Sequence, residues 1–379
     1  MNHYNWIWFS MSTLPFTAFV GLEELKRALL VLAVDNSIEG LLIMGPKGTG
    51  KSSIVRAMTD ILPEIYLVSD CPFNCDPYNE TNMCDLCKER IIKGEKLPVK
   101  KTKMKVITLP IGATEDMVLG TINIEKTLQE KRIIFEPGIL GRANRNILYI
   151  DEVNLLPDHI VDSILDAAAS GWNIVEREGI SLKHPAKFIL IGTMNPEEGE
   201  LRPQLLDRFA ISVKLSTIKD PNVRAKIVKR NIEFQTKKED FLKKWEPQQK
   251  ILKEKIEKAR KILKNVQIDD EMILRVSRTC ALLEVDGYRP DIVAIKVARA
   301  LAALDGRLQV IEEDLFEGLR YALTHRTRAE GLKAPPTEEE ISNIFYGYTS
   351  GIRQKVKIKN TQTGKKSQEK FRFFPRWSF

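Results

Sequence analysis

The chain has 379 residues, of which 43% are hydrophobic, and its 59 Lys and Arg against 51 Asp and Glu give a net charge of +8. This length predicts about two domains with sizeable cores, and the composition excludes disorder throughout. No apolar run reaches the length of a membrane span, and the amino terminus lacks the basic and apolar regions of a secretory signal, so a cytoplasmic location is expected.

The elements predicted in chain order alternate between strands and helices in the first half. Residues 40–44 predict a buried strand that runs into a Gly-rich loop and then a helix at 53–61. Two further strands at 147–151 and 187–192 enclose a helix at 158–170 and a hairpin at 172–186. This alternation predicts an α/β fold with a parallel sheet flanked by helices.

Helical patterns alone follow residue 215. They cover 221–234, 249–266, 269–284, 289–304 and 311–325, and we expect a break near Pro247. We therefore predict four parts: an N-terminal extension (1–15), a nucleotide-binding core (16–218) with a Cys-rich insertion (70–104), an all-α domain (219–330), and a linker with a tail (331–379).

Positive charge is concentrated in that tail. Residues 350–379 contain nine basic residues and one acid, which equals the net charge of the whole chain. The body of the chain is balanced, and Arg177 and Lys183 of the predicted hairpin are matched by Glu176 and Glu178. We therefore expect no nucleic-acid partner, and we expect the basic-aromatic tail to dock on an acidic partner protein.

A phosphate-binding loop is predicted between the first strand and the first helix. The segment consists of Gly45, Pro46, Lys47, Gly48, Thr49, Gly50, Lys51 and Ser52 and fits the pattern G-x-x-x-x-G-K-[ST]. Its glycines let backbone N–H groups turn toward phosphate oxygens, and the helix amino terminus adds a positive dipole end. Lys51 is expected on the β/γ-phosphates of ATP and Ser52 on Mg²⁺.

Polar residues at the ends of the next two strands complete the predicted site. Asp151 follows a buried strand and is expected to hold Mg²⁺, and Glu152 is expected to polarise the attacking water. Asn195 emerges from the third strand and is expected to hold that water or the γ-phosphate, although an Asn before Pro is also common in turns. Arg208 and Arg289, taken alone, are better explained as surface ion pairs, because arginines are common and sequence spacing does not place them.

Four cysteines lie within 17 residues, at Cys71, Cys75, Cys84 and Cys87. Tetrahedral Zn²⁺ on four thiolates is the simplest interpretation, an iron–sulfur cluster uses the same ligands, and free or redox-paired thiols remain a third possibility. Cys280 stands apart and is expected to be a small buried residue, with a redox thiol as the alternative.

Taken together, the P-loop, the strand ILYIDE and the segment LRPQLLDRF resemble the AAA+ ATPases. Residues 16–328 are similar, more narrowly, to the ATPase I subunit of magnesium chelatase, through the long block from FEPGILGRANRN to LLDRF and the later DGYRPD. This resemblance implies an AAA+ core with a helical lid. It also implies sensor-1 for Asn195, an arginine finger acting in trans for Arg208, sensor-2 for Arg289, and a weaker interface role for Arg202.

The same resemblance implies what the complex does. The family forms rings, commonly hexamers, in which ATP hydrolysis powers metal insertion into a tetrapyrrole. Its partners are a D-type subunit with an integrin-type domain and a large porphyrin-binding H-type subunit. Related subunits also serve cobalt chelatases, and related AAA+ proteins act as remodelling chaperones for a metal-binding-domain partner. Both remain alternatives because the tail and the charged helices near 235–265 depart from the family pattern.

Overall fold

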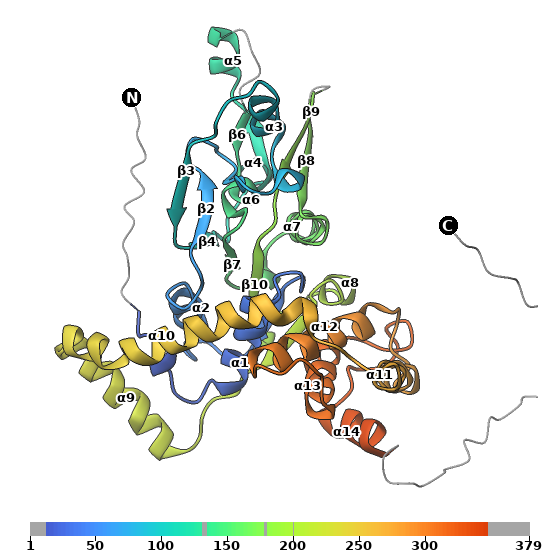
Figure 1. The fold of residues 1–379 in the computed structure, drawn as a ribbon. Helices are drawn as coiled ribbons and strands as arrows, with labels where there is room; N and C mark the ends of the chain where they lie inside the picture. The colour runs from blue at the N-terminus through green and yellow to red at the C-terminus, as the bar shows by residue number, and fades with distance from the viewer. Residues whose placement is uncertain (1–12, 131–134, 178–179, 200, 348–379) are drawn as a thin grey trace, which may run out of the picture.

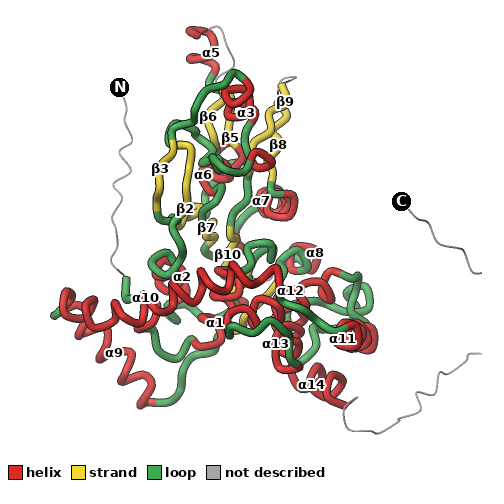
Figure 2. The backbone as a smooth tube through the Cα atoms, viewed as in Figure 1, coloured by secondary structure: helices red, strands yellow, loops and turns green. Residues whose placement is uncertain are grey.

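The computed structural model describes residues 13–130, 135–177, 180–199 and 201–347. A sheet-bearing core occupies the middle of the molecule, short strands project from one end of it, and a helical domain lies at the other (Figure 1). Figure 2 shows the same division, with most of the strands in the upper half and the long helices in the lower half. Among the described residues, no helix has the length and apolarity that a membrane crossing requires.

The central sheet has five parallel strands in the order β11-β1-β10-β7-β4. Their bounds are β11 (Ile211–Lys214), β1 (Leu41–Met44), β10 (Ile189–Met194), β7 (Ile147–Ile150) and β4 (Val106–Leu109). Because all five run the same way, the loops that follow β1, β7 and β10 leave at one edge of the sheet. The parallel sheet predicted from the sequence is therefore confirmed.

Both faces of this sheet are buried. Alternate residues of a strand point to opposite faces, so each strand contributes to two cores. Leu41 and Ile43 face a core that continues into the helical domain, whereas Leu42 and Met44 face a separate core. The first core is covered by α1 (Glu23–Val34) and α2 (Lys51–Met58), and the second by α6 (Ile139–Ala143), α7 (Asp158–Ser170) and α8 (Pro203–Leu206).

Three excursions project beyond β4 and β7. The Cys-rich insertion contains β2 (Ile65–Val68), η2 (Glu80–Asn82), α3 (Asp85–Ile92) and β3 (Val99–Thr102). A second excursion contains α4 (Glu115–Leu119), β5 (Gly120–Ile122), α5 (Ile124–Glu130) and β6 (Phe135–Pro137). The third is the antiparallel hairpin of β8 (Trp172–Arg177) and β9 (Ile180–Pro185), which confirms the hairpin predicted at 172–186.

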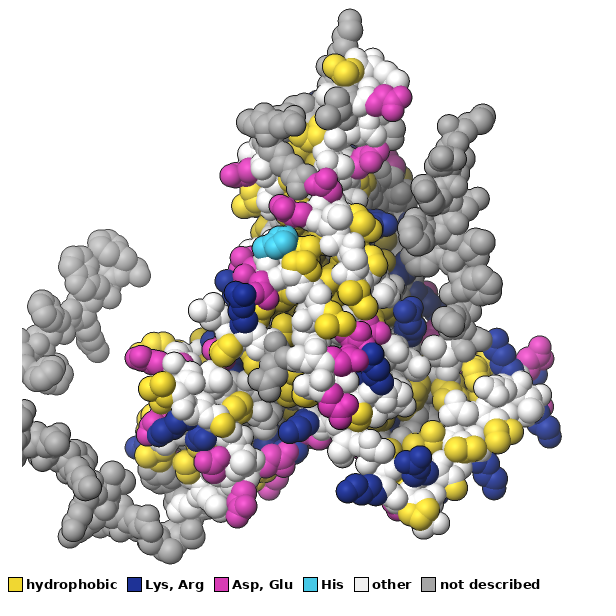
Figure 3. Space-filling model, turned by 180° about the vertical axis from the view of Figure 1, so that it is seen from behind, with side chains coloured by type: hydrophobic (Ala, Val, Ile, Leu, Met, Phe, Trp, Pro, Cys, Tyr) yellow, Lys and Arg dark blue, Asp and Glu magenta, His cyan; other side chains and the backbone are white. Residues whose placement is uncertain are grey.

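The helical domain consists of α9 (Pro221–Thr236), α10 (Lys238–Ile262), α11 (Asp270–Leu282), α12 (Arg289–Leu304), α13 (Glu312–Leu323) and α14 (Glu338–Gly347). Short 3₁₀ turns complete the chain at η1 (Phe16–Ala18), η3 (Val153–Leu155), η4 (Pro196–Glu198) and η5 (Leu263–Asn265). Helices α12 and α13 pack closely at Gly318, where a Cβ atom would overlap the main-chain oxygen of Ala294. Seen from behind, basic and hydrophobic side chains share the surface of the α9–α10 arm (Figure 3).

The helical domain differs from the prediction in two places. Helix α10 continues through Pro247 without a break. A proline inside a helix costs about 3 kcal/mol, but Phe241 before it and Ile256 after it are both buried, so packing on the two sides holds one continuous helix. Residues 338–347, expected in the linker and tail, form α14, because Ile341 and Phe345 are fully buried. The tail from residue 348 lies outside the described residues.

Candidate active site

The P-loop lies between the end of β1 and the start of α2, as predicted. Gly45, Gly48 and Gly50 have φ of 151°, 76° and 85°, conformations that side chains with a Cβ rarely adopt. Gly45 is also crowded, since a Cβ there would lie 2.7 Å from the main-chain oxygen of Leu215. The ammonium of Lys51 donates to the main-chain oxygens of Gly45, at 2.5 Å, and of Pro46, at 3.0 Å. Burial lowers the pKa of Lys51, and the charge of Asp151 opposes that shift.

Asp151 is held by hydroxyl groups from two neighbouring strands. Its Oδ1 accepts hydrogen bonds from Thr193 on β10, at 2.6 Å, and from Tyr149 on β7, at 3.0 Å. Burial and the Asp151 charge raise the pKa of Tyr149, so that phenol remains a hydrogen-bond donor. Ser52 and Asp151 line the same groove, and both offer the hard oxygen ligands that Mg²⁺ prefers.

Glu152 follows Asp151 in a left-handed conformation with φ of 54°. A residue other than glycine in this region costs about 1–3 kcal/mol, and the hydrogen bond from the Glu152 N–H to the Thr193 hydroxyl, at 3.0 Å, holds it there. The Glu152 carboxylate forms an ion pair with Lys47 at 3.1 Å, and Lys47 also pairs with Glu198 at 2.6 Å. These hydrogen bonds raise the pKa of the exposed Lys47 ammonium.

Asn195 emerges from β10 at the same edge of the sheet and is 6% exposed. Its side-chain oxygen accepts a hydrogen bond from the N–H of Glu197, at 3.4 Å, and thereby caps the short turn η4. Thr193, which lies two residues earlier, was not predicted as a site residue. A hydroxyl residue near the end of a buried strand was the signal that could have identified it.

A groove of about 1080 Å³ extends from the P-loop along the helical domain. Lys47, Thr49 and Ser52 line one end of it, together with Asp151. The rest of the lining includes residues that are far from the P-loop in sequence, among them Phe19 and Leu22 near the amino terminus and Asn231, Phe234 and Gln235 on α9. The groove offers a nucleoside a place beside the phosphate loop.

Arg208 and Arg289 lie at the opposite edge of the sheet. Arg208 precedes β11 and forms ion pairs with Asp162 and Asp166 on α7, at 3.2 and 2.6 Å. Arg289 opens α12, pairs with Glu39 just before β1, and donates to the main-chain oxygen of Arg208. Within the described chain, the lining of the groove includes neither arginine.

Arg202 is largely exposed and pairs with Asp158 at 2.7 Å. The structure therefore brings Lys51, Ser52, Asp151, Glu152 and Asn195 together and leaves Arg208 and Arg289 apart from them.

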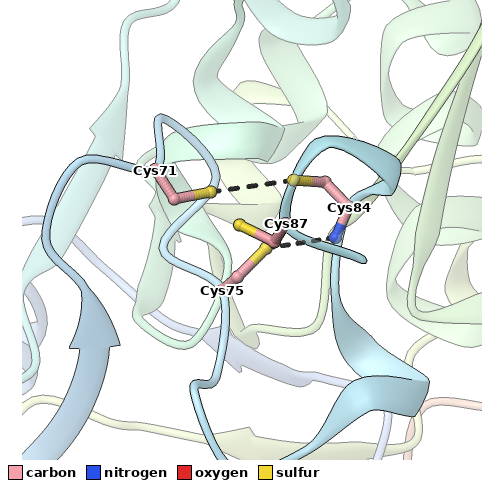
Figure 4. A group of neighbouring side chains, drawn as sticks. All are labelled: Cys71, Cys75, Cys84 and Cys87. Carbon is pink, nitrogen blue, oxygen red and sulfur yellow. Dashed lines mark hydrogen bonds between the residues drawn. The ribbon is translucent and has the colours of Figure 1, made fainter. Parts of the chain in front are cut away.

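The four cysteines of the insertion form a compact group. Their sulfur atoms lie within 4.8 Å of one another, and all four side chains are buried. The sulfurs point toward a common centre, with Cys71 and Cys75 from the loop after β2 and Cys84 and Cys87 from the start of α3 (Figure 4). Cys280 lies apart on α11, where burial raises the pKa of its thiol and keeps it protonated.

These features define a P-loop ATPase of the AAA type with a helical lid. Residues 93–209 match the AAA domain of the dynein-related subfamily, and residues 273–344 match the AAA lid domain.

Close relatives give the family. The chain is 52% identical over 326 residues to the magnesium-chelatase subunit ChlI homolog of Methanocaldococcus jannaschii, covering 86% of this chain and 88% of that protein. It is 51% identical over 332 residues to magnesium-chelatase subunit ChlI of Mesostigma viride, covering 88% of this chain and 92% of that protein. The chain belongs to the ChlI family and is an AAA+ ATPase of the magnesium-chelatase type.

Solved structures agree with this assignment. One chain from a cryo-EM structure of the complex between the BchI and BchD subunits of magnesium chelatase is 39% identical, with a TM-score of 0.50, and the match covers 88% of this chain and 99% of that one. A putative ATPase from Cytophaga hutchinsonii, 17% identical with a TM-score of 0.54 over 86% of this chain and 89% of that one, shares the fold. The remodelling-chaperone and cobalt-chelatase alternatives are not favoured by these relatives.

Proposed function

We propose that this subunit hydrolyses ATP in a homo-oligomeric ring, with a hexamer as the expected form, and that the ring drives metal insertion into a tetrapyrrole. A D-type subunit with an integrin-type domain and a large porphyrin-binding H-type subunit are the proposed partners. The observation that carries the proposal is the Lys51, Asp151 and Glu152 site at one edge of the sheet, with Arg208 and Arg289 at the other. A ring brings these two edges together between neighbouring copies.

Each residue of the site has a proposed task. Lys51 exchanges its main-chain partners for the β- and γ-phosphates, and the glycine N–H groups hold the other phosphate oxygens. Ser52 and Asp151 hold Mg²⁺, which supplies positive charge to the phosphates during transfer. Glu152 leaves Lys47 to orient and polarise the attacking water, and Asn195 holds that water from the neighbouring strand.

The two arginines are proposed to act in trans. The four residues of β1 rise about 3.3 Å each, so about 10 Å of strand separates its two ends. Arg208 and Arg289 lie beyond the amino ends of β11 and β1, whereas the P-loop follows the carboxyl end of β1. Their own phosphate site is therefore out of reach, and a neighbour's site is the place where both guanidinium groups stabilise the transferring phosphate.

The Cys group is proposed to hold a metal, either Zn²⁺ or an iron–sulfur cluster, and such thiolates need a reducing compartment, which favours the cytoplasm.

A reconstitution tests the proposed function. The full-length subunit is mixed with the D-type and H-type subunits, a porphyrin and Mg²⁺, and metalloporphyrin is followed by its fluorescence while phosphate release is measured. ATP-dependent metal insertion with the wild-type chain and none with Lys51→Ala is the expected result. Rapid ATP hydrolysis with no metalloporphyrin in any combination of subunits contradicts the coupling.

A further inference from the structure

We propose that Cys71, Cys75, Cys84 and Cys87 bind a single Zn²⁺ ion. We also propose that this ion fixes the conformation of the loop 71–76, which holds the hairpin β8–β9 in position on the ATPase core. The inference rests on the thiolate-bound metal proposed above and adds the kind of metal and what the metal does. It does not depend on which tetrapyrrole the complex serves.

The distances between the sulfurs favour one ion over a cluster. Four thiolates on Zn²⁺, each about 2.3 Å from the metal, lie about 3.8 Å apart. The sulfurs of Cys71 and Cys84 are 3.8 Å apart, and every pair in the group lies within 4.8 Å. In an iron–sulfur cluster, thiolates bound to different irons are separated by bridging sulfides and lie farther apart. The group has room for one tetrahedral ion.

Backbone N–H groups also point at the sulfurs. The N–H of Phe73 donates to the sulfur of Cys71 at 3.4 Å, and the N–H of Cys84 donates to the sulfur of Cys75 at 3.1 Å. Such bonds stabilise thiolates and orient metal ligands. Cys84 and Cys87 lie at the amino terminus of α3, whose dipole further favours the thiolate form. The donors thus suit the charged form of the ligands.

The hydrophobic core of the insertion is small. Its buried cluster contains eight residues, and four of them are the cysteines; the others are Val68, Phe73, Met83 and Leu97. A core of this size does not stabilise an insertion of this length by hydrophobic burial, and small modules of this kind depend on a metal. An ion bound by the four sulfurs supplies the stability that this small core lacks.

The loop 71–76 is bonded to the segment that leads into β7. Three polar contacts join them: the Asn144 amide to the oxygen of Phe73 at 2.7 Å, the Asn74 amide to the oxygen of Arg142 at 3.0 Å, and the Arg145–Asp76 ion pair at 2.9 Å. The metal-held loop is therefore anchored on the strand that carries Asp151 at its far end.

The same loop supports the hairpin. The ring of Phe73 stacks on the ring of His184 on β9, with centroids 4.6 Å apart and planes at 15°. On β8, the ring of Trp172 lies under the ammonium of Lys88, which belongs to α3 and is 5.4 Å from the ring centroid. Both strands of the hairpin thus contact residues that lie one or two positions from metal ligands in the sequence, so the position of the hairpin depends on the ion.

Metal analysis and hydrogen exchange on the full chain test the proposal. Wild-type protein should contain one zinc per chain and neither iron nor sulfide, and apo protein titrated with Co²⁺ should show the visible spectrum of a tetrahedral tetrathiolate site. Cys75→Ser should lose zinc, and amide exchange in residues 172–185 should become about tenfold faster or more. Cys280→Ser, which removes a buried cysteine outside the group, is the matched control and should behave as wild type.

A second variant separates metal binding from its consequence. Phe73→Ala keeps all four thiols, so it should keep one zinc per chain while exchange in the hairpin still becomes faster. Iron with sulfide, or no metal at all, overturns the zinc site. Loss of zinc without any change in the hairpin would show that the loop 71–76 does not position it. Binding of a fluorescent ATP analogue by the same preparations should stay within about threefold of wild type, because the phosphate site lies elsewhere. Failure of nucleotide binding in the wild-type chain would count against the proposed function alone.

Discussion

The guanidinium of Arg289 donates a hydrogen bond to the main-chain oxygen of Arg208, with the two atoms 2.8 Å apart. Arg289 opens a helix of the lid, and Arg208 lies in the turn between α8 and β11 of the ATPase core, so this contact crosses the boundary between the two domains. The two arginines proposed to serve a neighbouring site are therefore positioned by each other. Movement of the lid relative to the core therefore changes the surface that the two arginines form together.

Loss of Arg208 should abolish most ATP hydrolysis, because an arginine finger contributes about 10³–10⁵-fold to the rate. Arg208→Ala and Lys51→Ala proteins should each be inactive, yet a mixture of the two should regain part of the activity. Some interfaces in mixed rings pair an intact P-loop with an intact arginine. Phosphate release across a series of mixing ratios measures this effect. Arg90→Ala, which removes an ion-paired arginine from the insertion, is the control, and normal hydrolysis by Arg208→Ala alone would disprove the assignment.

Lys51→Ala should weaken ATP binding by about 10–100-fold, because a hydrogen bond to a charged group contributes about 1.5–3 kcal/mol. Stability should change little, since the ammonium bonds only to oxygens of its own loop. Fluorescence titration with an ATP analogue and a thermal melt by circular dichroism separate the two effects. A melting temperature that falls as far as that of a core truncation would show that the lysine supports the fold instead.

Glu152→Gln should bind ATP as wild type does and hydrolyse it about 10²–10⁴-fold more slowly, because an amide cannot act as a general base. Glu198→Gln is a matched control, since Glu198 pairs with the same Lys47. The comparison uses single-turnover hydrolysis at saturating ATP. Equal rates in Glu152→Gln and wild type, or an equal loss in both variants, would remove Glu152 from its proposed role.

A chain ending at Tyr348 should form rings and hydrolyse ATP like the full chain, but bind its partner more weakly and with less dependence on salt. A chain ending at Thr337 should be less stable, because it also loses α14 and exposes the surface that Ile341 and Phe345 cover. Removing one such aromatic side chain typically costs about 3–5 kcal/mol. Urea unfolding, sizing and partner binding of the two chains distinguish the tail from the helix. Loss of the ring at Tyr348 would make the tail an assembly element.

Stability should fall on mild acidification through His325. Burial lowers the pKa of this histidine to about 3, and its Nε2 lies 2.9 Å from the main-chain oxygen of Phe209. The unfolded chain takes up the proton near pH 6.5 while the folded chain does not, so this contribution is lost as pH falls from 6.5 toward 3. Between pH 7 and pH 5 the loss amounts to about 2 kcal/mol. His325→Gln should show a shallower decline in urea unfolding; an unchanged slope would contradict the buried neutral histidine.

The phosphate site was predictable because its residues are close in sequence or follow buried strands. The Gly45–Ser52 loop needs only its own glycines and the strand before it, and Asp151 needs only the end of β7. Thr193 was less visible because its role depends on the register of β10 against β7, in which Gly192 lies beside Ile150. The spacing of residues within one strand does not reveal how that strand aligns with its neighbour.

The groove and the arginines depend on contacts between distant segments. Asn231 and Phe234 line the nucleotide groove only because α9 returns to the amino-terminal segment, where Arg230 donates to the main-chain oxygen of Ala18. The continuation of α10 through Pro247 likewise follows from packing on both sides of the proline, which overrides the local preference. Local patterns predict elements well and their partners poorly.

Helix α10 connects the α9 arm with the lid. Its 25 residues span about 38 Å, from the α9 arm that lines the nucleotide groove to the lid helix α12, which begins at Arg289. Gln249 accepts a hydrogen bond from the N–H of Thr17, and Arg260 donates to the main-chain oxygen of Ala33, so α10 contacts the ATPase core at two points. A tilt of the helix by about 5° shifts its far end by about 3 Å, which in the proposed ring is enough to make or break an arginine–phosphate contact.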